Sequence, residues 1–145
     1  MKYLLFCLIW AWVDKTIITL TAIYNLLFDW FEVRKVLIIA PLRVARDTWS
    51  AEIEKWEHLN GLTYSVVIGT EKERLSALQK KAHVYLINRE NVEWLIMKSG
   101  YAFDFDMLVI DDDFVKTFPK YLRQTNSQIF SYLFVHVYQT RNFNL

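Results

Sequence analysis

Short apolar runs and amphipathic segments alternate along most of the chain. The run at residues 35–40 reads KVLIIA and stops at Pro41, and continuous β-branched stretches of this kind are typical of strands buried on both faces. Three shorter apolar runs, at residues 64–68, 83–87 and 107–110, predict further strands. The last of them runs directly into three consecutive aspartates.

Segments with helical periodicity separate these runs. Apolar residues recur at spacings of three and four within residues 14–31 and again within residues 43–57, which predicts two amphipathic helices. Residues 71–81 predict a charged helix, and residues 91–97 a short one. Strands that alternate with helices predict right-handed crossovers, and therefore an α/β fold with a mainly parallel sheet and helices on both faces.

The ends of the predicted strands are the positions at which we expect function. Ligands of open parallel sheets bind outside the carboxyl ends of the strands. By this rule, the positions of interest lie just after Val13, Ala40, Ile87 and Ile110.

The chain begins with an apolar run, Tyr3 to Val13, behind a basic Lys2. The run is well short of the about 20 residues that a membrane-spanning helix needs, so no stable membrane span is predicted. We interpret it as a buried strand of a cytoplasmic protein, although a basic start and an apolar middle also fit the signal peptide of a secreted one. Trp10 and Trp12 weigh against a signal peptide, whose cleavage site requires small residues.

Composition and charge narrow the class of protein. A chain of 145 residues with 54% hydrophobic and 17% aromatic residues suits one ordered domain with a core of its own. The net charge of +1 predicts no chain-wide attraction to nucleic acid, which leaves a local basic patch as the electrostatic route to it. A lone Cys7 excludes an intrachain disulfide and a cysteine-based metal site, and the three histidines are too far apart in sequence to suggest zinc.

Two pairs of residues stand where nucleotide chemistry would need them. Asp111 and Asp112 follow the last predicted strand, where carboxylates can hold Mg²⁺ and orient a water molecule. A solvated acidic loop explains them equally well. Lys15 and Thr16 open the first predicted helix, as the Lys and Thr of a phosphate-binding loop do.

A phosphate-binding loop needs glycines, which permit positive φ and let a phosphate approach the backbone amides. Residues 10–14 read WAWVD and contain none. Each non-glycine residue forced into left-handed geometry costs about 1–2 kcal/mol. The two indoles would also fill the phosphate space, and Asp14 would place a negative charge beside a polyphosphate. We therefore expect this segment to bind ATP poorly.

Basic side chains follow two other predicted strands. Arg43, Arg46 and Arg89 occupy positions from which a side chain can contact the phosphates of a nucleotide or a nucleic acid. Each of them, taken singly, also fits an ordinary exposed residue of a helix.

Three segments together resemble the first motor (RecA-like) domain of superfamily 2 helicases, most of all the DEAD/DEAH-like phage and bacterial proteins related to Swi/Snf-type ATPases. They read KVLIIAPLRVARDTWSAEIEKW, VYLINRENVEWL and FDMLVIDD, in this order and spacing. The resemblance covers about residues 14–112 and implies a partial P-loop NTPase lobe over residues 1–118. It also implies ATP and Mg²⁺ as cofactors, and DNA and a second motor lobe, in another chain, as partners.

The resemblance assigns roles to individual positions. Lys15 and Thr16 fall on the Lys and Thr of the family's GKT loop. Asp111 falls on its Mg²⁺-binding aspartate, and Asp112 replaces its catalytic glutamate. The motifs that contact the nucleic-acid backbone in the family fall here on Ala40, Pro41 and Arg43, and on Asn88 and Arg89.

The family pattern is lost at both ends of the chain. The loop glycines before Lys15 are absent, and after Asp112 the chain continues into an aromatic tail, residues 119–145, without family resemblance. We therefore expect a fragment of an ATP-dependent DNA helicase or translocase that does not hydrolyse ATP alone, since the loop glycines and the second lobe are missing. The alternative is a non-enzymatic remnant that binds nucleic acid or protein.

Overall fold

The computed structural model describes residues 3–7 and 15–111, and the side chains from residue 16 onward. Three features singled out in the sequence lie outside the described residues: the glycine-free segment 10–14, Asp112, and the tail at residues 119–145.

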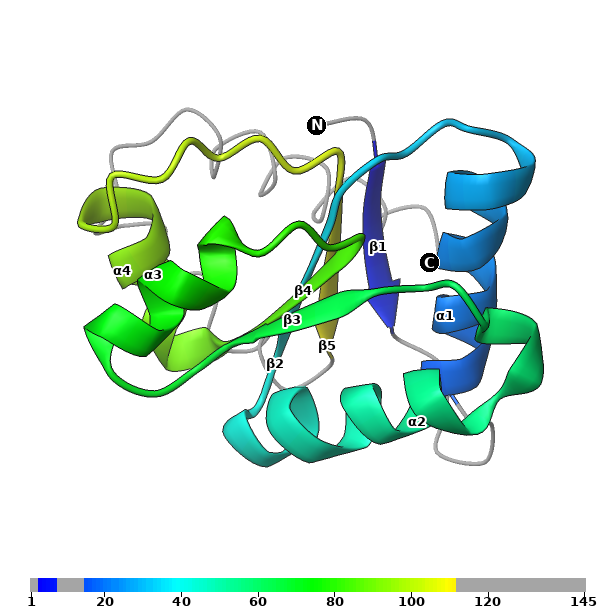
Figure 1. Cartoon of the computed structure of the whole chain (residues 1–145), viewed down its shortest axis with the longest axis horizontal. Helices are drawn as coiled ribbons and strands as arrows, with labels where there is room; N and C mark the ends of the chain where they lie inside the picture. Colours follow the sequence, from blue (N-terminus) through cyan, green and yellow to red (C-terminus); the bar gives the residue numbers. More distant parts are fainter. Residues whose placement is uncertain (1–2, 8–14, 112–145) are drawn as a thin grey trace, which may run out of the picture.

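The described part of the chain is an α/β fold around one sheet, as the sequence predicts. All strand pairs are parallel, and the five strands lie in the order β1-β5-β2-β4-β3 (Figure 1). Their bounds are Tyr3–Cys7 for β1, Val36–Ala40 for β2, Tyr64–Val67 for β3, Val84–Asn88 for β4 and Met107–Asp111 for β5.

Each predicted helix is present, but the two long ones are divided. The first is the α-helix α1, which continues as a π-helical turn, and the second is a π-helical turn that continues as α2 and then as a 3₁₀ turn. In chain order the helical segments are α1 (Lys15–Tyr24), Asn25–Asp29, Val44–Thr48, α2 (Trp49–Lys55), Glu57–Leu59, α3 (Glu71–Gln79), Arg89–Asn91 and α4 (Val92–Met97).

The sheet separates two hydrophobic cores, because alternate strand residues point to opposite faces. Leu37, Ile39 and Ile87 belong to the core on which α3 and α4 pack. Ile38 and Leu86 belong to the core on which α1 and α2 pack. Every residue of β2 and of β4 is buried, so these are central strands covered on both faces, as their continuous apolar runs predict. Figure 1 shows the two pairs of helices on opposite sides of the sheet.

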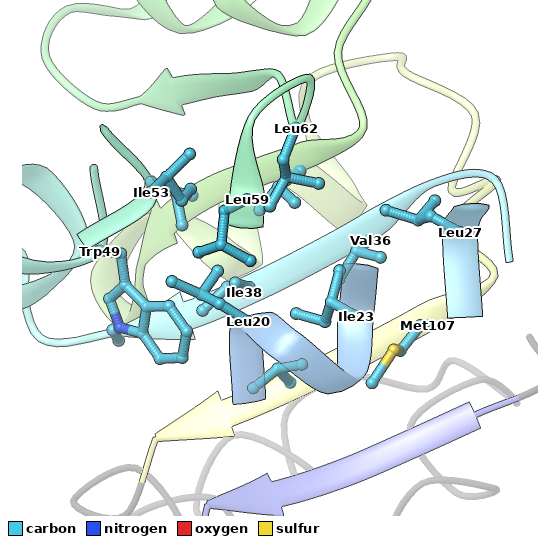
Figure 2. Packing of buried hydrophobic residues seen from close by; sticks show 14 of the residues in the cluster. Leu20, Ile23, Leu27, Val36, Ile38, Trp49, Ile53, Leu59, Leu62 and Met107 are labelled. Atoms are coloured by element: carbon cyan, nitrogen blue, oxygen red, sulfur yellow. The ribbon is translucent and has the colours of Figure 1, made fainter. Parts of the chain in front are cut away.

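The core under α1 and α2 is built around one indole. Trp49, the first residue of α2, is 1% exposed. Figure 2 shows it beside Leu20 of α1 and Ile38 of β2. Leu20, Ile38 and Trp49 therefore pack against one another. Because they belong to α1, β2 and α2, this packing holds both helices against the same face of the sheet.

The predicted N-terminal strand is present over its first part. The structure describes it as a strand at Tyr3–Cys7, and the functional position expected directly after Val13 lies outside the described residues. β1 lies at the edge of the sheet and pairs with β5. Within residues 3–7 and 15–111, no helix has the length and apolar character needed to cross a membrane.

His83, just before β4, makes the stability of this fold depend on pH. Its Nδ1 accepts a hydrogen bond from the Thr63 backbone N–H at 3.1 Å, and its ring meets Phe28 edge-on at 5.0 Å between centroids. Burial, together with the nearby Lys81 ammonium, lowers the pKa of His83 below its ordinary value of 6.5. The folded state therefore prefers the neutral ring, while the unfolded chain takes up a proton at about pH 6.5.

We expect the free energy of unfolding to fall as the pH drops through 6.5 toward the lowered pKa of His83, because the unfolded state then binds more protons. His83→Asn keeps an oxygen that can accept from Thr63 but does not titrate. Urea unfolding of both proteins from pH 8 to pH 5 measures the effect, since the stability difference between them isolates His83. A difference that stays constant over that range would contradict the prediction.

Candidate nucleotide and nucleic-acid interface at the carboxyl edge of the sheet

Four neighbouring strands end at one level. Cys7 of β1 pairs with Asp111 of β5, and Ala40 of β2 pairs with Asn88 of β4. β2 and β5 are joined in the register Ile39 with Ile110, so Ala40 and Asp111 are the next residues of each. The residues that the sequence predicted at strand ends are therefore brought together into one row, which we call the carboxyl edge. α1 starts at this end of the sheet, toward which β1 points (Figure 1).

Asp111 lies in the middle of this row. It is half-buried at the tip of β5, and the four strand residues before it are buried. Within residues 3–7 and 15–111, no group of three or more His, Cys, Asp or Glu side chains is placed to hold a metal ion. Mg²⁺ at a nucleotide usually takes one or two protein carboxylates and fills its other positions with water and phosphate oxygens, and Asp111 would be one such carboxylate.

Lys15 and Thr16 form the first residues of α1 at the same edge, and Thr16 is half-buried. The three glycines of the chain, at positions 61, 69 and 100, all have positive φ and serve turns elsewhere. None is left for the segment before Lys15. The helix start and the acidic strand end thus suit a nucleotide, but the residues before Lys15 do not fit the cradle for its phosphates.

Asn88 is a buried polar group of the edge. It is 6% exposed, and its amide donates to Glu90 Oε2 at 2.9 Å while its carbonyl accepts from Asn91 Nδ2 at 2.5 Å. Asn91 in turn accepts from Arg74 Nη1 of α3 at 2.6 Å. The Arg74 guanidinium lies over the buried indole of Trp94, 4.1 Å from its centre. This polar chain ties α3 to the turn that follows β4.

The three arginines predicted to contact phosphate all follow strands of the carboxyl edge, and two of them are paired with the next residue. Arg46 makes two hydrogen bonds to Asp47, from Nε at 2.9 Å and from Nη2 at 3.0 Å. Arg89 Nε donates to Glu90 Oε1 at 3.0 Å. Arg43 is exposed at the start of the helical segment after β2.

These pairs shift the acidity of the carboxylates. The hydrogen bonds from Arg46 lower the pKa of Asp47. Burial acts to raise the pKa of Glu90, but the hydrogen bonds from Arg89, from its own backbone and from Asn88 outweigh it and lower that pKa. Both carboxylates are therefore ionised at neutral pH and available as partners of the guanidinium groups.

Sequence reasoning missed Arg74, Glu90 and Asn91. The spacing Asn88–Asn91 was a usable signal, because two amides three residues apart after a strand can meet across a turn. Arg74 had no local signal, since it reaches Asn91 from 17 positions away.

No family model matches the chain, and a curated phage protein is similar to most of it. Protein p41 of Acyrthosiphon pisum secondary endosymbiont phage 1 is 37% identical over 107 residues. The match covers 72% of this chain and 23% of the phage protein. The chain therefore spans about a quarter of the length of the curated relative that it matches.

Proposed function

We propose that the chain is a first motor lobe of the superfamily 2 type, from an ATP-dependent DNA helicase or translocase, that does not hydrolyse ATP by itself. The observation that supports this most is the row at the carboxyl edge. The sheet register puts Asp111, Asn88 and the turn after Ala40 at one level, and these are the positions that the three helicase-like segments provide. α1 begins at the same edge with Lys15 and Thr16.

Two features argue that this lobe is inactive alone. The residues before Lys15 lack the glycines that a polyphosphate cradle needs. Hydrolysis in motors of this type also uses an arginine from outside the first lobe to stabilise the charge of the transferred phosphoryl group. Asp111 and Lys15 would orient a nucleotide weakly, without the groups that complete its hydrolysis.

An ATPase assay of the purified chain with Mg²⁺ and single-stranded DNA tests this. We expect phosphate release at the rate of the buffer, and the same rate for Lys15→Ala and for Asp111→Asn. Turnover by the unmodified chain that both substitutions abolish would show that the lobe is a working ATPase.

A second candidate is a nucleic-acid-binding module without enzymatic activity. The observation in its favour is that Arg43, Arg46 and Arg89 follow β2 and β4, which are neighbours in the sheet, and so lie at one edge. Such a module binds a polynucleotide through its phosphates, so its affinity falls steeply with ionic strength. Both candidates share this surface and predict no ATP turnover by the chain alone. A nucleotide-binding measurement separates them, because only the motor lobe is expected to keep weak binding of Mg²⁺ and ATP that Lys15→Ala and Asp111→Asn remove.

A further inference from the structure

Glu90 holds Arg89 in the arrangement that a phosphate would require. Its carboxylate is divided between two donors, with Oε1 accepting from Arg89 Nε at 3.0 Å and Oε2 from Asn88 Nδ2 at 2.9 Å. Asn88 is itself fixed by Asn91, and Asn91 by Arg74. A continuous network of hydrogen bonds from Arg74 through Asn91 and Asn88 therefore positions the Glu90 carboxylate. An ion pair on the surface without such a network would be free to rearrange.

A second pair of adjacent arginine and carboxylate lies in the helical segment Val44–Thr48, which follows the neighbouring strand β2. Arg46 presents Nε and Nη2 to the two oxygens of Asp47. This two-pronged contact is the geometry with which a guanidinium also binds phosphate. In both cases the carboxylate belongs to the residue directly after the arginine, and in both the arginine follows a strand of the carboxyl edge.

We propose that Glu90, and in the same way Asp47, occupies the phosphate position of its arginine, so that a polynucleotide binds this edge only by displacing these carboxylates. This rests on the proposed contact between the carboxyl edge and nucleic acid. The two acidic residues act as internal competitors that lower the affinity of the edge for a phosphate backbone.

Both ion pairs are exposed to solvent, so a phosphate can replace the carboxylate at each arginine. The side chain of Arg89 is 36% exposed and that of Glu90 53% exposed, and the corresponding values are 54% for Arg46 and 60% for Asp47. Ion pairs at this exposure are weak, since water and salt screen them. A phosphate that brings several neighbouring charges along one backbone can therefore replace them.

The test measures binding of a fluorescein-labelled single-stranded DNA oligonucleotide of mixed sequence by fluorescence anisotropy at low salt. Glu90→Gln removes the charge but keeps an oxygen that can accept from Asn88, so the turn after β4 is retained. We expect binding about threefold tighter for Glu90→Gln, and about tenfold tighter when Asp47→Asn is added, from the size of exposed ion pairs.

Two controls separate this exchange from a general effect of charge. Asp29→Asn makes the same change of net charge at an exposed position after α1, away from the carboxyl edge, and we expect no measurable gain from it. In an Arg89→Gln background, Glu90→Gln should also lose its effect, because no guanidinium remains to be released. A gain that persists in that background, or that Asp29→Asn reproduces, would overturn the proposal.

The outcomes also distinguish this inference from the proposed function. Binding that Arg89→Gln weakens but Glu90→Gln leaves unchanged refutes the competition and keeps the nucleic-acid surface. Absence of binding in the unmodified chain and in every variant refutes both.

Discussion

Trp49→Ala is expected to cost about 3–5 kcal/mol of the free energy of unfolding. The indole is 1% exposed and packs among residues of α1, α2 and β2, so its removal leaves a cavity at the point where these elements meet. Small domains are stable by about 5–15 kcal/mol in total, so a loss of this size removes a large part of the folded population.

Trp49→Phe should cost far less, below about 1.5 kcal/mol. Within the described part of the chain, the indole Nε1 is buried without a hydrogen-bond partner. Replacing it by a phenyl ring removes a donor whose burial is unfavourable, and this offsets part of the lost packing.

Urea unfolding followed by far-ultraviolet circular dichroism measures both effects. Trp30→Ala is the matched control, because the Trp30 side chain is 65% exposed and its loss should change stability by less than about 0.5 kcal/mol. If Trp49→Ala and Trp30→Ala were equally stable, the indole of Trp49 would not be the centre of this core.

Replacement of Arg43, Arg46 and Arg89 together by Gln is expected to weaken binding of single-stranded DNA on the order of a hundredfold at low salt, since each exposed contact contributes a net of about 1 kcal/mol. The salt dependence should change as well. Loss of three phosphate contacts reduces the slope of log affinity against log salt by about 2 for a single strand.

The matched control for this variant replaces Arg34, Lys80 and Lys81 by Gln. These three residues are exposed and stand before β2 and β4, at the opposite edge of the sheet, and their loss changes the net charge by the same amount, from +1 to −2. We expect this control to keep the salt slope of the unmodified chain. Equal weakening by both triple variants would show that binding follows overall charge and does not use the carboxyl edge.

The proposed competition by Asp47 and Glu90 would limit how well the carboxyl edge binds a phosphate backbone. Four opposed charges, Arg46 with Asp47 and Arg89 with Glu90, nearly neutralise it in the free protein. Nucleic-acid-binding surfaces usually carry an excess of basic residues. The near balance of charges at this edge agrees with the low net charge of the whole chain, which is +1. Under the proposed competition, the affinity of the edge for phosphate depends on exchange between carboxylate and phosphate, in addition to attraction.

The fold followed closely from the sequence because its signals are local. The runs at residues 36–40 and 84–88 are apolar without interruption, and a strand covered on both faces needs that pattern. Asp111 and Asn88 were predicted at one edge because parallel strands end on the same side of a sheet. The strand predicted within the first thirteen residues is present at Tyr3–Cys7, and the remainder of that apolar run lies outside the described residues.

By itself, the sequence determined the alternation of strands and helices, the parallel sheet, the edge that carries polar residues, and the absence of glycine before Lys15. These depend on periodicity and on backbone geometry within a few residues. Only the tertiary structure decided the strand order, the meeting of Arg74 with Asn91, and the pairing of each arginine with the carboxylate beside it. The physical reason is that strand order and the contact between Arg74 and Asn91 join residues distant in the chain, whereas each arginine pair depends on rotamers that neighbouring packing selects.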